Sequence, residues 1–438
     1  MLFFSVSMQR TYVSEVKVGH EVMLKGWVHE LRLMSKMAFV LLRDSSGIVQ
    51  CVVKDKDVSN LTLESVVEIK GKAKAAKVKA EGVRDDVEVD VSEINILSKA
   101  EKLPIQVNEK TTTTDLSKRL DYRWLDLRKP EHFLVFKIWT YMEEAMREYW
   151  LSNGYTQIYT PKFMSAASES GAELFEVKYF DQKAYLAQSP QFFKQMAMSA
   201  GFDKIFEIAP AFRANPSNTS RHDTEFTMID IEISFINSEE DVMNEEEKWI
   251  TYFLKKVKEK YGEEIKKVFG VEVVVPKLPF PRIAMAEALS VLKKKNYKPS
   301  EEGDLDAEGE KLLCNYIKEK HGHEFVFVKE YPISVRPFYH MRQENNPKLT
   351  KSFDLIWKGI EITTGAQREH RVDILERQAK EKGINLKSIK TYLDFFRYGC
   401  PPHGGCALSP TRLLTIMLNL GNVREATFLP RDMKRLNP

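Results

Sequence analysis

Hydrophobic and polar residues alternate through the first quarter of the chain, from residue 12 to residue 98. Alternation with a period of two, interrupted by polar turn residues, predicts short β-strands. The predicted strands cover residues 21–28, 38–43, 48–54, 66–73 and 87–97. Five short strands indicate a small barrel, and the oligonucleotide-binding (OB) barrel is one such architecture. We therefore assign residues 1–105 to an N-terminal barrel domain.

A polar connector follows, and we place a linker at residues 106–130 and a second domain at 131–438. This domain opens with a helix whose apolar residues share one face and which ends near Gly154. Further helices are predicted at 191–199, 239–261, 373–382, 386–396 and 410–418, and strands at 155–159, 184–187, 205–208, 227–235, 325–328 and 355–363. Strands and helices do not alternate strictly, which favours an α+β fold with an antiparallel sheet.

Composition narrows the class of protein. The 438 residues are 43% hydrophobic and 29% charged, which is typical of a globular enzyme of two or three domains. The net charge of +3 does not by itself indicate nucleic-acid binding. Four scattered cysteines argue against a disulfide framework and favour the reducing cytoplasm. No apolar stretch is long enough to span a bilayer, so we expect no membrane association.

Polar clusters in the second domain carry candidate chemistry. Arg213, Arg221 and His222 fall in one loop between two apolar strands, where arginine can clamp a phosphate or carboxylate. Asp354 and Glu361, with Thr364, offer the oxygen ligands that Mg²⁺ prefers. Each cluster has a structural alternative: a surface acidic pair, or histidines that only stabilise the fold. The cysteines and histidine in residues 400–406 do not fit the spacing of a usual zinc site.

Together the clusters resemble the three signature motifs of class II aminoacyl-tRNA synthetases. Residues 154–161 resemble motif 1, whose family role is the dimer interface, residues 212–226 resemble motif 2, and residues 404–412 resemble motif 3. The barrel is similar to the anticodon-binding domain of the aspartyl, asparaginyl and lysyl subgroup, and residues 428–438 resemble the end of archaeal-type aspartyl enzymes. The resemblance implies an OB barrel joined to an antiparallel catalytic domain, and a homodimeric, ATP-dependent aspartate–tRNA ligase.

The resemblance also implies site residues. Arg213 and Arg412 would be catalytic, and Mg²⁺ would be held by Asp354, Glu361 and Thr364. The residues implied to bind aspartate are Glu169, Gln191, Lys194, Arg213, Thr364 and Arg368. Those implied to bind ATP are Arg213, Asn215, Arg221, His222, Asp223, Phe226, Glu361, Ser409 and Arg412, with adenine stacked between Phe226 and Arg412. The family usually has glutamate at position 215, and we expect little loss because the amide of Asn215 can accept the same hydrogen bond. The family usually has glycines where Ala407 and Ser409 stand, so weaker ATP binding is one expectation from motif 3.

Three barrel residues would recognise the tRNA anticodon. Phe39 would stack on a base, Gln50 would hydrogen-bond one, and His29 is typical of relatives that charge both tRNA(Asp) and tRNA(Asn). We therefore favour a non-discriminating enzyme. The alternatives are an enzyme restricted to tRNA(Asp), an ATP-dependent asparagine synthetase, which would lack the barrel, and a non-enzymatic RNA-binding relative, which would lack the catalytic arginines.

Overall fold

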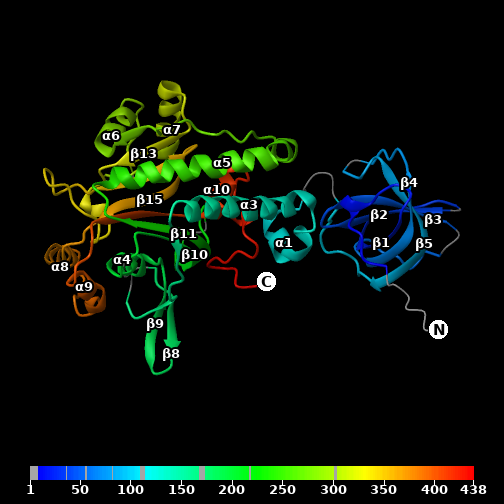
Figure 1. Cartoon of the computed structure of the whole chain (residues 1–438), viewed down its shortest axis with the longest axis horizontal. Helices are drawn as coiled ribbons and strands as arrows, with labels where there is room; N and C mark the ends of the chain where they lie inside the picture. The colour runs from blue at the N-terminus through cyan, green and yellow to red at the C-terminus, as the bar shows by residue number, and fades with distance from the viewer. Residues whose placement is uncertain are drawn as a thin grey trace. The chain divides into compact units, whose positions relative to one another are not determined.

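The computed structural model describes residues 8–35, 37–54, 57–80, 82–108, 114–166, 173–216, 219–299 and 303–438. They form two compact units, Met1–Lys129 and Pro130–Pro438 (Figure 1). In the described ranges no helix is long and apolar enough to cross a membrane.

The first unit is a closed five-stranded barrel with strand order β1-β2-β3-β5-β4. Its strands are β1 (Glu21–Leu33), β2 (Met37–Asp44), β3 (Gly47–Lys54), β4 (Val66–Ala75) and β5 (Val87–Ser98), after a short 3-10 helix η1 (Val13–Glu15). Alternate residues such as Val40, Leu42, Val49 and Cys51 fill the interior. The barrel predicted from the alternating pattern is confirmed. Two short helices, α1 (Leu116–Asp121) and α2 (Arg123–Asp126), lie where the sequence indicated a connector.

The second unit is built on an eight-stranded sheet with order β12-β13-β14-β15-β16-β11-β10-β6. Its strands are β6 (Thr156–Gln157), β10 (Lys204–Phe212), β11 (Glu225–Ser234), β12 (Arg282–Ala284), β13 (Phe325–Lys329), β14 (Ser352–Trp357), β15 (Ile360–Arg368) and β16 (His403–Leu408). The neighbours pair antiparallel except for β10 with β6 and β12 with β13. A small sheet, β7-β9-β8, is formed by β7 (Phe163–Met164), β8 (Glu176–Tyr179) and β9 (Gln182–Leu186). The predicted α+β class is confirmed.

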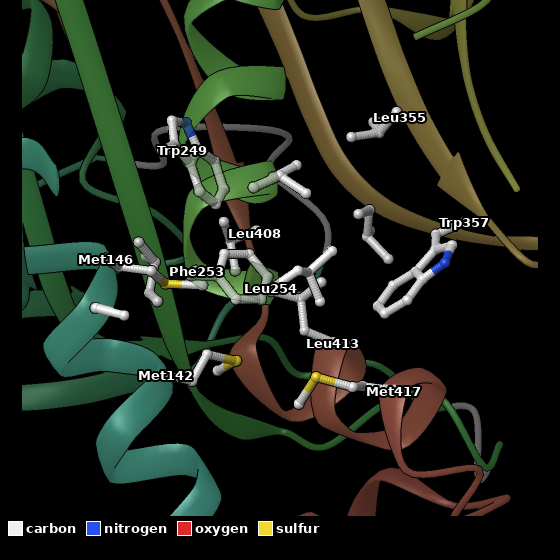
Figure 2. Close-up of a cluster of buried hydrophobic side chains, with 14 of the residues drawn as sticks. Met142, Met146, Trp249, Phe253, Leu254, Leu355, Trp357, Leu408, Leu413 and Met417 are labelled. Carbon is white, nitrogen blue, oxygen red and sulfur yellow. The ribbon is translucent and has the colours of Figure 1, made fainter. Parts of the chain in front are cut away.

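Helices cover this sheet. They are α3 (Pro130–Ser152), α4 (Gln191–Ser199), α5 (Glu239–Phe269), α6 (Met285–Lys293), α7 (Ala307–His321), α8 (Val372–Glu381), α9 (Lys390–Phe396), α10 (Pro410–Met417) and α11 (Val423–Ala426), with a 3-10 turn η2 (Ile333–Val335). The long helices α3 and α5 pack against each other (Figure 1). Figure 2 shows how Met142 of α3, Phe253 of α5 and Leu413 of α10 meet in the core beneath the strands.

The structure corrects the strand predicted at 355–363. This segment is a hairpin, because Lys358 and Gly359 adopt positive φ angles of 49° and 81° and reverse the chain between β14 and β15. Residues 403–408, where the sequence predicted no strand, form β16 inside the eight-stranded sheet. The helix predicted at 386–396 begins only at Lys390, whereas the one predicted at 239–261 continues to Phe269.

Candidate active site

A buried ion-pair cluster joins helix α4 to strand β11. Lys194 Nζ lies 2.9 Å from Asp230 Oδ1 and 3.3 Å from Glu232 Oε2, and all three side chains are buried. Asp230 and Glu232 are two positions apart on β11, so their side chains point to the same face. Burial lowers the pKa of Lys194, but the charges of Asp230 and Glu232 outweigh this effect and the net shift is upward. Lys194 is therefore a stable ammonium ion within the protein.

Arg368, at the end of β15, adds a second cation to this cluster. Its Nε donates to Glu232 Oε1 over 3.0 Å, and its Nη2 donates to the carbonyl oxygen of Gly405 over 2.9 Å. A Cβ at Gly405 would stand 2.3 Å from Glu232 Oε2, so only glycine leaves room for that carboxylate. Lys194 and Arg368 thus converge on one acidic group, an arrangement suited to a ligand carboxylate.

The other residues predicted for the amino-acid pocket are only partly described. Gln191 begins α4, one helical turn before Lys194, and is buried. Its Nε2 has no hydrogen-bond partner among the described residues, which leaves a buried donor available to a ligand. Glu169 lies outside the described residues.

The second part of the site is a cavity of about 170 Å³. All the residues predicted to bind ATP line it: Arg213, Asn215, Arg221, His222, Asp223, Phe226, Glu361, Ser409 and Arg412, together with Thr364. They come from the β10–β11 hairpin, β15 and the β16–α10 junction, segments far apart in the sequence. Lys194 and Arg368 do not line this cavity.

Two arginines present unpaired donors here. The guanidinium carbon of Arg213 lies 5.6 Å from the centre of the Phe226 ring. Arg412 Nη1 donates to the carbonyl oxygen of Glu361 over 2.8 Å and lies 3.4 Å from Glu361 Oε1. The Nε atoms of both arginines are buried and have no hydrogen-bond partner among the described residues. In this structure Arg213, rather than Arg412, faces the ring of Phe226. Such donors favour an anionic ligand.

The loop between β10 and β11 adds Arg221 and His222. Arg221 Nη1 donates to Glu310 Oε2 over 2.9 Å, which ties the loop to helix α7. Burial, together with the charges of Arg412, Arg213 and Arg221, lowers the pKa of His222 to about 4. His222 is therefore neutral at pH 7 before any ligand binds.

The acidic residues meet through a β-bulge. Asp354 pairs with Thr364 across β14 and β15, but the register then shifts so that Ile356 pairs with Glu361. The extra residue brings Glu361 to the face of Thr364, whose hydroxyl donates to Glu361 Oε1 over 3.2 Å. Burial and the neighbouring charge of Asp354 raise the pKa of Glu361. Two carboxylates that repel each other beside a hydroxyl, the buried Asp354 and the partly exposed Glu361, fit a hard divalent cation.

Asp223 and Ser409 also line the cavity. Asp223 Oδ2 accepts a hydrogen bond of 2.9 Å from the Thr427 hydroxyl, and burial raises its pKa to about 6. Ser409 is the N-cap of α10 with φ −103°, a conformation that any residue adopts, and Pro410 occupies the first turn. The backbone of motif 3 therefore does not require glycine at position 409.

Some residues of the site were missed from the sequence. Asp230 and Glu232 had a signal, because two acids interrupt the apolar run 228–233 at alternate positions. Glu310 and His340 had none, since they reach the site from a helix and an irregular segment with no local pattern. Arg336, which bonds to Asp354 over 2.5 Å, was missed for the same reason.

Comparison with known proteins agrees with this geometry. The family described as tRNA synthetases class II (D, K and N) matches residues 115–433, and an OB-fold nucleic acid binding domain matches residues 22–97. The chain belongs to the class II tRNA synthetases. The match to the barrel leaves the asparagine synthetase alternative without support, because that enzyme would lack this domain.

Full-length relatives of this synthetase are known. An aspartate–tRNA(Asp/Asn) ligase of Aeropyrum pernix is 42% identical over 97% of both chains, and an aspartate–tRNA(Asp) ligase of Pyrococcus abyssi is 42% identical over 97% of this chain and 98% of its own. Among solved structures, an asparaginyl-tRNA synthetase from Pyrococcus horikoshii complexed with asparaginyl-adenylate has a TM-score of 0.89 at 32% identity, covering 98% of this chain and all of its own. An aspartyl tRNA synthetase from Entamoeba histolytica has a TM-score of 0.88 at 29% identity, covering 100% of this chain and 94% of its own.

In the barrel of the synthetase, His29 occupies a β-bulge. The pairing of β1 with β2 shifts between Val28 and Glu30, so His29 is the extra residue. Its Nδ1 lies 2.8 Å from Arg43 Nη1, and Arg43 also bonds to both carboxylate oxygens of Glu64 over 2.8 Å. Arginine only donates, so His29 Nδ1 is the acceptor of this bond. The bulge and Arg43 together fix where the ring of His29 points.

Phe39 and Gln50 share one face of the barrel. Phe39 pairs with Val52 across β2 and β3, which makes Gln50 its diagonal neighbour on the same face. This face is opposite to the interior, which Ala38 and Val40 fill. Gln50 Nε2 donates to Glu88 Oε2 over 2.9 Å. Phe39 is half-buried and outside the barrel core, so it is not an ordinary core aromatic residue.

Proposed function

We propose that this synthetase joins L-aspartate to tRNA at the expense of ATP. The observation that carries the proposal is the pair of buried cations, Lys194 and Arg368, that converge on Glu232. A carboxylate side chain of the substrate makes charge-assisted hydrogen bonds to both cations. The amide of asparagine lacks the charge, and each such bond is worth about 1.5–3 kcal/mol.

The first step forms aspartyl-adenylate. A carboxylate oxygen of aspartate attacks the α-phosphorus of ATP, a new P–O bond forms, and pyrophosphate leaves with the electrons of the broken bond. Arg213 and Arg412 would stabilise the charge on the phosphate oxygens with their unpaired Nε donors. Arg221 and His222 would hold the outer phosphates, with Asn215, Asp223, Phe226 and Ser409 around the nucleoside.

The second step transfers aspartate to tRNA. A hydroxyl of the terminal ribose attacks the acyl carbon, the ester bond forms, AMP leaves, and the hydroxyl proton is released. No protein base is needed in the first step because the α-carboxylate is already ionised at pH 7. The work of the protein is positioning and charge stabilisation. Glu169 and Gln191 would hold the substrate in place with Thr364.

We infer that Mg²⁺ accompanies ATP and that Asp354, Glu361 and Thr364 hold it. The support is the pair of repelling carboxylates at the β-bulge, with Asp354 Oδ1 unpartnered among the described residues. Mg²⁺ would neutralise charge on the triphosphate oxygens. Arg336 forms an ion pair with Asp354 and would keep that carboxylate oriented toward the cation.

We further propose that the enzyme charges both tRNA(Asp) and tRNA(Asn). His29, held at its bulge by Arg43, supports this proposal, and Phe39 and Gln50 offer stacking and hydrogen bonding to single-stranded anticodon bases. The second candidate is an enzyme restricted to tRNA(Asp). Relatives of both kinds match the chain equally well, as their names show, so overall identity favours neither.

We also propose a cytoplasmic homodimer formed through α3. A groove of about 1130 Å³ runs beside this helix, lined by its residues together with Pro210 and Phe428. Leu151 and Phe428 expose 60% and 59% of their surface there, an apolar area that suits an interface. Light scattering with size-exclusion chromatography tests it, and a monomeric mass would overturn it. The four free cysteines suit a reducing compartment.

Charging assays test the function. Radiolabelled aspartate and asparagine are offered with purified tRNA(Asp) and tRNA(Asn) at one fixed salt concentration, because phosphate contacts depend on salt. We expect aspartate, and not asparagine, on both tRNAs. His29→Trp should reduce charging of tRNA(Asn) while that of tRNA(Asp) persists. Charging of tRNA(Asp) alone by the natural protein would establish the restricted enzyme.

A further inference from the structure

His340 lies beside Arg368 in the backbone and in the side chains. The two residues form an isolated antiparallel bridge, flanked by hydrogen bonds from Met341 N to Gln367 O over 3.0 Å and from Glu369 N to Tyr339 O over 2.9 Å. Arg368 Nη1 lies 3.0 Å from His340 Nε2. Each residue is only 3% exposed. The contact is therefore fixed by the fold and not by a mobile surface pair.

The proton positions of this contact follow from the chemistry. The guanidinium group has only donors, so His340 Nε2 must accept, and the ring is neutral with its hydrogen on Nδ1. Burial and the charges of Arg368, Arg336, Lys194 and Lys382 lower the pKa of His340 well below its usual value, in agreement with a neutral ring.

The other ring nitrogen of His340 is in an energetically unfavourable environment. Nδ1 is buried and has no hydrogen-bond partner among the described residues. A buried donor without a partner costs about 1–3 kcal/mol. An apolar side chain would avoid this cost, so the contribution of His340 must come from Nε2. Its backbone is held separately, because the Gln378 amide donates to the His340 carbonyl over 3.1 Å.

The guanidinium of Arg368 is thus held at all three nitrogens. Nε meets Glu232, Nη2 meets the carbonyl of Gly405, and Nη1 meets His340. Three bonds in different directions fix the plane of the group. Without the third, the planar guanidinium is held along one edge only, by Glu232 and Gly405, and can swing about its Cδ–Nε bond out of alignment with a substrate carboxylate.

We propose that His340 is a positioning residue for the substrate carboxylate, acting through Nε2 on the plane of Arg368. The inference rests on the proposed aspartate specificity. His340 acts on the amino-acid pocket alone, because neither it nor Arg368 lines the nucleotide cavity. Its removal should therefore change the KM for aspartate and leave the KM for ATP unchanged.

The test is aspartate-dependent exchange of pyrophosphate into ATP by the full chain. His340→Leu removes the acceptor and should raise the KM for aspartate about 10- to 100-fold, with the KM for ATP unchanged. His340→Gln places an amide oxygen near the position of Nε2 and should restore most of the affinity for aspartate. His340→Phe is a second variant without an acceptor that keeps an aromatic ring, should the leucine variant fail to fold.

The controls separate the possible failures. If the natural protein catalyses no aspartate-dependent exchange, the proposed function fails, whatever the variants do. If it is active and His340→Leu or His340→Phe leaves the KM for aspartate unchanged, or raises both KM values equally, the inference fails alone. It also fails if His340→Gln is as impaired as His340→Leu. His323→Leu removes a histidine whose hydrogen bonds run to backbone atoms of Lys277 and Phe325, and should not separate the two KM values.

Discussion

Arg221 and Glu310 form a hydrogen-bonded ion pair of 2.9 Å between the β10–β11 loop and helix α7. Glu310 is buried, and burial together with the charge of Glu361 raises its pKa to about 7. Arg221 lines the cavity in which we propose that ATP binds, so an incoming triphosphate would meet an arginine that already has an acidic partner. Glu310 and the outer phosphates would therefore compete for the same guanidinium.

Glu310→Gln should lower the KM for ATP about two- to fivefold, because the amide no longer competes for Arg221 or repels the triphosphate. The KM for aspartate should stay the same. Pyrophosphate exchange at varied ATP concentration measures both values. Glu308→Gln, an exposed glutamate two positions earlier on α7, is the matched control. A higher KM for ATP in the Glu310 variant would instead show that this carboxylate orients Arg221 for phosphate.

Lys194→Met should damage both stability and catalysis. The substitution leaves Asp230 and Glu232 in the protein interior without their shared ammonium ion. Breaking a buried pair by removing one partner costs about 3–5 kcal/mol of the free energy of unfolding, which urea denaturation measures. Aspartate activation should fall at least about 100-fold as the substrate loses one cation. Lys183→Met, at an exposed surface pair with Glu176, should change neither quantity appreciably.

Sequence patterns were sufficient for the barrel and for the class of the second unit. Polar and apolar residues alternate along much of β4 and β5, so the side chains of these strands that face the interior were evident. The hairpin of β14 and β15 was not evident from the sequence. Buried residues occupy both faces of these central strands and hide the turn at Lys358 and Gly359. A strand covered on both sides reads as one continuous apolar run.

The residues of the candidate site also fall into those that the sequence indicated and those that it did not. Residues carried by motifs, such as Arg213 and Arg412, were found because their neighbours in the sequence share the chemistry. Glu310 bonds to Arg221 and His340 bonds to Arg368, from segments about 90 and 30 residues away in the chain. Only the packing of the folded chain brings these residues to the site, and a single sequence contains no pattern that indicates this packing. The β-bulge that unites Glu361 with Thr364 was hidden for the same reason.

Ser409→Gly tests whether the altered motif 3 weakens ATP binding. Ser409 has φ −103° and makes no capping hydrogen bond from its side chain, so its conformation needs no glycine. The KM for ATP should change by less than about threefold, and the free energy of unfolding by a few tenths of a kcal/mol. A KM for ATP that falls tenfold would show that the serine side chain hinders the nucleotide. Ser388→Gly, at an exposed serine remote from the cavity, is the control for the added flexibility.

Glu246 should make stability fall as pH rises. It lies on α5 beneath the sheet, accepts a hydrogen bond from Thr363 over 2.5 Å, and burial raises its pKa from 4.5 to about 8. Between these values the folded protein keeps the proton that the unfolded chain releases, so the free energy of unfolding decreases with pH. Glu246→Gln removes this dependence and should become more stable than the natural protein by about 1–3 kcal/mol at pH 7.5, with little difference at pH 5. Urea denaturation across this range measures it, with the exposed Glu259→Gln on the same helix as the control. Parallel curves for the natural protein and the Glu246 variant would mean that the carboxyl group is ionised in the folded state.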